Sequence, residues 1–203
     1  MTSTTIHTPR IIMMMDIETL GKRATAVAWQ TALFAVESTD PETILDRPHH
    51  AYLPIQPQLD LNRVIDGDTM LFWMKPEQDA ARQGMVTECD SEDFDELVAA
   101  LRHFNRAFER YADQAQGDWE LWTRGNFDAP IMESLLRQCG LPCHWSNEFR
   151  KLRDLRTFEA IAGVSYKDVQ PQPGFIKHRA DHDAVFQLTH LAALNKALGA
   201  DKV

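Results

Sequence analysis

The chain has 203 residues, of which 44% are apolar and 25% are charged. This length suits a single compact α/β domain with a sizeable core, and the composition excludes the disordered and fibrous classes of protein. The net charge of −9 argues against a broad basic face that binds extended duplex nucleic acid, so any nucleic-acid substrate would be held locally.

The beginning of the chain predicts neither a membrane span nor a secretion signal. Residues 1–9 have no apolar period and are expected to form a flexible N-terminus, followed by a single domain over residues 10–203. The apolar run Ile11–Met15 is far shorter than the ~20 residues that cross a bilayer. No basic segment with a small-residue cleavage site precedes this run, so we expect a cytoplasmic protein without a membrane partner.

The first third of the chain predicts three strands. They are expected over Arg10–Ile17, Ala24–Val36 and His49–Ile55. The second is a near-continuous apolar run, which is typical of a central strand that is buried on both faces of a sheet. Gly21 permits a tight turn between the first two strands, and Asp40 and Pro41 mark the next turn. A further strand is expected over Trp119–Thr123.

Apolar residues at helical spacing predict helices around this last strand. The shorter expected ranges are Asp66–Met74, Pro76–Gln83, Ala129–Cys139, Thr157–Ala162 and Ala180–Leu198. A longer helix is expected to begin after a cap at Asp90 or Ser91 and to run to about Ala112. The mixture of strands and helices indicates an α/β fold.

Two carboxylates lie close together at the end of the first expected strand. Asp16-Ile17-Glu18 places them at positions i and i+2, so both side chains project from the same face of the strand. Neighbouring anions repel each other, and a bound cation would relieve that repulsion; oxygen ligands suit Mg²⁺ or Mn²⁺ rather than zinc. The D-x-E pattern is also frequent by chance, so it does not establish a metal site by itself.

Two more acidic residues open predicted helices. Asp128, in Asn126-Phe127-Asp128, follows the Trp119–Thr123 strand, and its ordinary role there would be to cap a helix. Asp183 lies in the first turn of the last helix, and His178, five residues earlier, could fold back over the same site. The ordinary alternatives for this pair are a solvated His and a capping Asp.

In chain order, these three segments resemble the DEDDh exonucleases of the DnaQ-like superfamily. The resemblance spans residues 10–198 and is closest to the branch of phage exonuclease A-like and bacterial 3′-5′ exoribonuclease-like proteins. The segments that carry it are Met15–Gly21, Asp154–Thr157 and His178–Ala184. A sister group of the family has a Tyr four residues before the last Asp, where this chain has Arg179, so the resemblance selects the histidine subclass.

The resemblance implies an RNase H-like fold with a five-stranded mixed sheet flanked by helices. It also implies that two divalent cations, Mg²⁺ or Mn²⁺, are held by Asp16, Glu18, Asp128 and Asp183. His178 would act as the general base. The implied activity is 3′-5′ hydrolysis of single-stranded DNA or RNA to nucleoside 5′-monophosphates. Homodimers are common among related exonucleases, which leaves a homodimer open for this chain.

Four other residues are candidates for substrate binding. The resemblance implies that Leu20 and Gly21 seat the terminal nucleotide, although the same residues would also form a simple turn. Trp73 could stack on a base or lie buried in the core. Arg156 could contact a phosphate or pair with Asp154.

Two other functions fit the same pattern of residues. A metal-dependent phosphodiesterase that acts on short oligonucleotides or nucleotide diesters would use the same carboxylates in a more closed pocket. A catalytically silent nucleic-acid-binding protein could keep the fold without the chemistry. The presence of all five candidate catalytic residues argues against the silent alternative.

Overall fold

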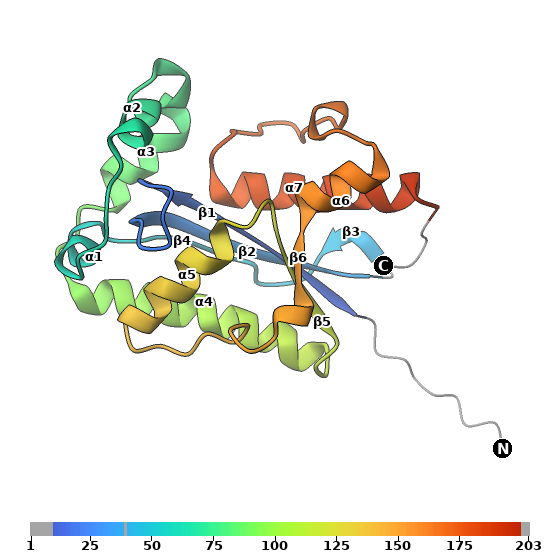
Figure 1. Cartoon of the computed structure of the whole chain (residues 1–203), viewed down its shortest axis with the longest axis horizontal. Helices are drawn as coiled ribbons and strands as arrows, with labels where there is room; N and C mark the ends of the chain where they lie inside the picture. The colour runs from blue at the N-terminus through green and yellow to red at the C-terminus, as the bar shows by residue number, and fades with distance from the viewer. Residues whose placement is uncertain (1–9, 39, 200–203) are drawn as a thin grey trace.

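The computed structural model describes residues 10–38 and 40–199, so the expected flexible segment 1–9 lies outside the described residues. Its centre is a mixed sheet in the order β3-β2-β1-β5-β6, with β4 also paired to β2 (Figure 1). The strands are β1 (Ile11–Thr19), β2 (Ala28–Glu37), β3 (Asp40–Ile44), β4 (His49–Tyr52), β5 (Trp119–Thr123) and β6 (Leu152–Asp154).

The pairing pattern places β1 at the middle of the sheet. β1 runs antiparallel to β2 and parallel to β5, which in turn is parallel to β6. β4 pairs with β2 over Gln30–Leu33, whereas β3 pairs with its far end at Val36 and Glu37. The mixed sheet that the family resemblance implied is present, but it has six strands rather than five, because β3 and β4 pair with different parts of β2.

Helices cover both faces of the sheet. In Figure 1, α4 and α5 lie on one face and α6 and α7 on the other, while α1, α2 and α3 form a separate group beside the ends of β1 and β2. The α-helices are α1 (Gln56–Asp60), α2 (Gly67–Trp73), α3 (Asp79–Glu88), α4 (Phe94–Gln114), α5 (Asp128–Gln138), α6 (Leu155–Ala162) and α7 (Ala180–Ala197). Short 3-10 helices are η1 (Pro76–Gln78), η2 (Phe149–Lys151) and η3 (Tyr166–Asp168).

The alternation of side chains along β1 divides the core and orients the acidic pair. Met13 and Met15 pack into the core on the α4 and α5 side. Ile12 and Met14 pack into the core that includes α7. Because successive side chains point to opposite faces, Asp16 follows the even-numbered residues and faces α7. This burial on both faces explains why the strand is continuously apolar up to its acidic end.

Several elements differ from the sequence prediction. The expected turn at Asp40 and Pro41 is wrong, because β3 begins at Asp40 and pairs with the edge of β2. The strand is short and mostly exposed, so it carries little of the apolar signal that predicts strands. The three-residue β6 and the five-residue α1 were also not predicted, since neither is long enough to show a period.

The start of α4 also differs from the prediction. Asp93, rather than Asp90 or Ser91, is the N-cap, and its side chain accepts a hydrogen bond of 2.8 Å from the backbone N–H of Asp95. Ser91 instead accepts a hydrogen bond from the backbone N–H of Asp93. Several polar residues precede this helix, and the sequence pattern does not select among them because each is a good capping residue.

Candidate active site

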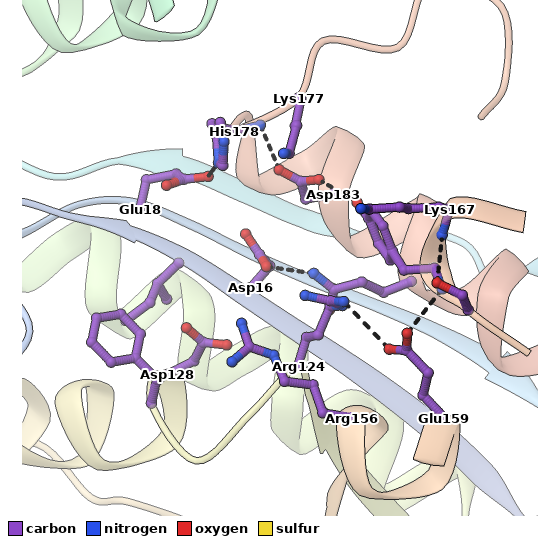
Figure 2. Close-up of a pocket in the computed structure, with 15 residues that line it drawn as sticks. Asp16, Glu18, Arg124, Asp128, Arg156, Glu159, Lys167, Lys177, His178 and Asp183 are labelled. Carbon is purple, nitrogen blue, oxygen red and sulfur yellow. Dashed lines mark hydrogen bonds and ion pairs between the residues drawn. The ribbon is translucent and has the colours of Figure 1, made fainter. Parts of the chain in front are cut away.

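Asp16 and Glu18 project from the end of β1 into a cavity of about 530 Å³ (Figure 2). Each carboxylate residue is only 9% exposed. Backbone pairing with β2 fixes both positions, since Asp16 lies opposite Ala32 and Glu18 opposite Gln30. The Gln187 side chain on α7 donates a hydrogen bond of 2.6 Å to Asp16 Oδ1. The central strand therefore holds two acidic groups rigidly at the cavity wall.

Asp128 reaches the same cavity from the first turn of α5. Phe127, not Asp128, is the N-cap of this helix, and no capping hydrogen bond from its side chain is found in the described structure. Asp128 is 5% exposed, so its carboxylate is buried without serving as the cap that the sequence also allowed. The helix N-terminus favours negative charge at this place.

Asp183 and His178 approach from α7 and the loop before it. Asp183 Oδ2 accepts a hydrogen bond of 2.6 Å from the backbone N–H of His178, and Asp183 Oδ1 accepts one of 3.2 Å from the Tyr166 hydroxyl. His178 has a φ of 65°, in the left-handed region that residues other than glycine rarely adopt. Its Nδ1 lies 4.0 Å from Glu18 Oε1. The strained backbone thus turns the imidazole back over the acidic cluster, as the sequence predicted.

The pKa values of the four carboxylates are raised, as expected for acidic groups buried close together without a cation. Burial, followed by repulsion from neighbouring carboxylates, raises the pKa of Asp16 and of Glu18 well above the usual values. Burial likewise raises the pKa of Asp128, and it raises the pKa of Asp183 to about 6. The pKa of Asp128 stays high even though Arg156 favours its ionised form. The charged cluster therefore lacks sufficient positive charge of its own.

A divalent cation fits the donor set. Ligand atoms of Glu18, His178 and Asp183 lie within 4.8 Å of one another, and Asp16 and Asp128 line the same cavity. Carboxylate oxygens are the preferred ligands of Mg²⁺ and Mn²⁺. A bound dication would reverse the pKa shifts by stabilising the ionised carboxylates. The structure thus brings together all five residues that the sequence nominated.

Burial, with a further contribution from Lys177, lowers the pKa of His178 to about 4. The imidazole is therefore neutral near pH 7 and can accept a proton. Phe72 of α2 packs edge-on against the imidazole, with the ring centroids 5.1 Å apart at an angle of 90°. This aromatic contact accounts for part of the desolvation of His178.

Basic side chains also line the cavity, among and around the acidic groups. They are Arg124, Arg156, Lys167 and Lys177 (Figure 2). Asp154 does not take up the Arg156 guanidinium in the described structure; its carboxylate accepts hydrogen bonds from the backbone N–H groups of Gly125 and Arg156 and from the Thr157 hydroxyl. The Arg156 side chain thus faces the cavity. Although the whole chain has a net charge of −9, four basic side chains gather at this one cavity.

A second cavity of about 290 Å³ adjoins the first, since Glu18 and Phe127 line both. Gly21 and Phe72 also line it. Leu20 is buried, and neither of these two cavities has it in its lining. The small volume and mixed lining of the second cavity suit one flat, partly apolar group.

Trp73 also borders the second cavity, but its residue is 3% exposed. Its indole N–H donates a hydrogen bond of 2.8 Å to the Thr19 carbonyl, which ties α2 to the end of β1. This is the packing role that the sequence allowed for Trp73. The half-buried Phe72 lies closer to His178 than Trp73 does, with ring centroids 5.1 Å apart against 6.1 Å. Sequence reasoning missed Phe72 because the sequence does not show which of two adjacent aromatic residues faces the site.

Residues 12–195 match the family described as the 3′-5′ exoribonuclease Rv2179c-like domain. This chain belongs to that family. Membership of the Rv2179c-like family agrees with the superfamily that the sequence motifs indicated. Among curated protein sequences, none matches the chain. In the described part of this Rv2179c-like domain, no helix is long and apolar enough to span a bilayer.

The fold of this Rv2179c-like domain is similar to solved structures of exonuclease I. The zinc-bound E. coli ExoI–ssDNA complex has a TM-score of 0.58 at 14% identity, over 94% of this chain and 41% of that chain. E. coli exonuclease I with a dA16 oligonucleotide gives 0.57 at 12% identity, over 92% and 41%. An ExoI/SSB-Ct complex gives 0.60 at 10% identity, over 95% and 42%.

At such low identity, the likeness to exonuclease I concerns the fold alone, and it confirms the RNase H-like class expected from the sequence. The Rv2179c-like chain spans only about two fifths of the length of these exonucleases, as the 41% and 42% coverages show. The activities and partners of those exonucleases are properties of proteins more than twice as long as the matched part, and the likeness does not transfer them to this chain.

Proposed function

We propose that this Rv2179c-like domain is a two-metal-ion 3′-5′ exonuclease that releases nucleoside 5′-monophosphates from single-stranded RNA or DNA. The observation that carries this proposal is the meeting of four buried carboxylates and a neutral imidazole in one cavity. Isolated buried anions are costly, so their retention together supports a site built for cations.

Asp16, Glu18, Asp128 and Asp183 would hold two Mg²⁺ or Mn²⁺ ions. When bound, such ions supply a water of lowered pKa and stabilise negative charge on the reacting phosphate and the leaving oxygen. His178 accepts one proton from the attacking water. The water oxygen forms a bond to phosphorus, and the bond from phosphorus to the preceding 3′ oxygen breaks. That oxygen takes up a proton, leaving a shortened chain with a 3′ hydroxyl and a free nucleoside 5′-monophosphate.

The two cavities suggest how a single strand lies across the site. The smaller one, beside Gly21 and Phe72, would receive the terminal nucleoside. Arg156 and Lys167, which line the larger cavity, would bind phosphates of the preceding nucleotides. The absence of a 2′-hydroxyl in DNA changes only individual contacts, so both sugars stay candidates; the family description favours RNA.

Digestion of 5′-labelled single-stranded RNA and DNA of equal sequence tests the proposal. With Mg²⁺ or Mn²⁺ we expect a ladder that shortens one nucleotide at a time from the 3′ end, and a chelator should abolish it. Asp16→Ala and His178→Ala should remove the ladder, whereas Asp95→Asn on the exposed start of α4 should not. Internal cleavage, or no cleavage by folded and metal-loaded protein, would contradict the proposal.

A metal-dependent phosphodiesterase for short substrates is the second candidate. The cavity of about 530 Å³ and the adjoining one of about 290 Å³ have room for very few nucleotides, which favours it. A length series from nucleotide diesters and dinucleotides to longer oligonucleotides separates the two functions. An increase of kcat/KM with length supports the exonuclease, and a maximum at two nucleotides or at a mononucleotide diester supports the alternative.

A further inference from the structure

Tyr166 is a residue of the cavity that no sequence motif identified. It begins η3, after a Ser165 N-cap whose side chain and backbone form a capping box with Asp168. The ring packs edge-on against Phe186 of α7, with centroids 4.5 Å apart at 88°. The Arg124 guanidinium lies over the same ring, 4.2 Å from its centroid. The phenol ring is therefore held between α7 and the Arg124 guanidinium.

Glu159 of α6 fixes both members of this stack. One of its oxygens accepts a hydrogen bond of 3.0 Å from the backbone N–H of Tyr166, and the other lies 3.3 Å from Arg124 Nη2. Glu159 is also half-buried, which makes this pair more ordered than a surface ion pair. A bidentate carboxylate that binds the backbone of Tyr166 and the cation on its ring leaves the ring little freedom to rotate away.

The hydroxyl of this fixed ring points at Asp183. Tyr166 donates its O–H to Asp183 Oδ1, and the backbone N–H of His178 donates to Oδ2, so each oxygen of the carboxylate has one donor. A carboxylate oxygen has two acceptor positions. One position on each Asp183 oxygen therefore remains for a cation, and the plane of the carboxylate is set from both ends.

We propose that Tyr166, held by Arg124 and Glu159, is a positioning residue that orients Asp183 as a metal ligand. This inference rests on the proposed function only in taking Asp183 as a ligand. Groups that hydrogen-bond a ligating side chain fix its geometry, and their removal typically weakens metal binding by about 10–100-fold. The alternative is that the hydroxyl contacts the substrate, because Tyr166 also lines the larger cavity.

The test compares Tyr166→Phe with Tyr111→Phe. Tyr111 offers a matched control, because it is buried and its hydroxyl hydrogen-bonds to the Asp46 carbonyl, in a different part of the molecule. Free Mn²⁺ is measured by electron paramagnetic resonance during titration of each protein without substrate. For Tyr166→Phe we expect about 10–100-fold weaker Mn²⁺ binding, with an unchanged fold by circular dichroism, and for Tyr111→Phe we expect wild-type affinity.

Kinetics at saturating Mn²⁺ separate the two roles of the hydroxyl. If Tyr166 acts through Asp183, KM for single-stranded RNA stays within about twofold of wild type when metal is saturating, since the phosphate contacts are intact. Wild-type Mn²⁺ affinity in Tyr166→Phe would overturn the inference, and a raised KM in that case would assign the hydroxyl to substrate. Weaker Mn²⁺ binding in a protein whose wild type cleaves no RNA or DNA would uphold the positioning role and reject the exonuclease.

Discussion

The candidate site has two walls that differ in structure: the strand wall, formed by Asp16 and Glu18 of β1, and the loop wall, formed by His178 before α7. Asp16 and Glu18 lie on the central strand, whose backbone is paired with β2 throughout and with β5 as far as Met14. His178 lies instead on the segment before α7, with a left-handed backbone. In the proposed mechanism, the strand fixes two of the carboxylates that would bind cations, and the loop presents the imidazole that would accept a proton.

The loop is nevertheless anchored at several points. His182 Nδ1 accepts a hydrogen bond of 2.8 Å from the backbone N–H of Ile176, and the side chain of Gln30 on β2 accepts one of 2.8 Å from the backbone N–H of Ala180. Asp183 holds the backbone of His178 between them. The comparison teaches that substitutions should act differently at the two places: loss of a carboxylate on β1 should weaken metal binding, whereas loss of the His178 imidazole should mainly slow proton transfer.

Asp16→Asn should have the largest effect, because it removes a charged carboxylate from the strand wall. Asparagine keeps an oxygen that can accept the Gln187 hydrogen bond but loses the charge. Loss of a cation from the site removes several kcal/mol of transition-state stabilisation, so we expect single-turnover hydrolysis to fall at least about 10³-fold. Without metal, the melting temperature should rise, since repulsion within the buried cluster is relieved. A lower melting temperature without metal would show that the charge does not strain the fold.

His178→Asn should remove the proposed base and leave the carboxylates of β1 unchanged. Asparagine tolerates the left-handed backbone, so the φ of 65° should persist in the variant. Removing a general base costs about 10²–10⁴-fold in rate. The pKa of His178 is lowered to about 4, so the acid limb of the wild-type kcat profile should be complete by neutral pH, and the variant should lose the part due to this group. The same limb in wild type and variant would place the base elsewhere.

Arg156→Gln should sharpen the comparison, since its side chain lines the cavity but is not expected to bind metal. If Arg156 binds a phosphate, KM for single-stranded RNA should rise about tenfold while kcat changes little. The dependence of binding on salt should also weaken by about one unit of slope on logarithmic axes. The exposed Arg102 on α4 provides the control, and Arg102→Gln should leave both quantities unchanged.

The smallest effect concerns stability and pH. The pKa of Asp183 is about 6 in the folded chain against an ordinary value of 3.8. A raised carboxyl pKa gives stability that is fully present below the ordinary pKa and is lost as pH rises through the folded one. Through Asp183, the difference in melting temperature between Mn²⁺-loaded and chelated protein should therefore grow from about pH 4 to 6, and the raised pKa values of the other three carboxylates should extend that rise to higher pH. A difference that is independent of pH would contradict a buried acidic ligand.

Long patterned elements of the fold could be predicted from the sequence. The apolar run of β1 and the apolar spacing of α4 and α7 identified these elements to within a few residues. β3 and β6 could not be predicted, because their hydrogen bonds to β2 and β5 define them and their side chains do not. A short strand at the edge of a sheet forms because the neighbouring strand supplies its hydrogen-bond partners.

The same division holds for the candidate site. The order of D-x-E, N-F-D and H-x4-D nominated five residues, and the structure brings them to one cavity. Tyr166 and Arg124 escaped notice, because Tyr166 of η3 reaches Asp183 of α7 only in the folded chain, and Arg124, which follows β5, lies over the Tyr166 ring. Trp73 shows the converse, since a large aromatic residue near the motif is consistent with stacking but is used here to anchor α2.

Direct titration of Mn²⁺ into wild type, Asp16→Asn and His178→Asn, followed by electron paramagnetic resonance, tests the central claim that the strand wall binds the cations. We predict two bound ions for wild type and for His178→Asn, with loss of both ions, or a large drop in affinity, for Asp16→Asn. Wild-type stoichiometry and affinity in Asp16→Asn would contradict the account, because the buried carboxylate on the central strand would then not be a ligand.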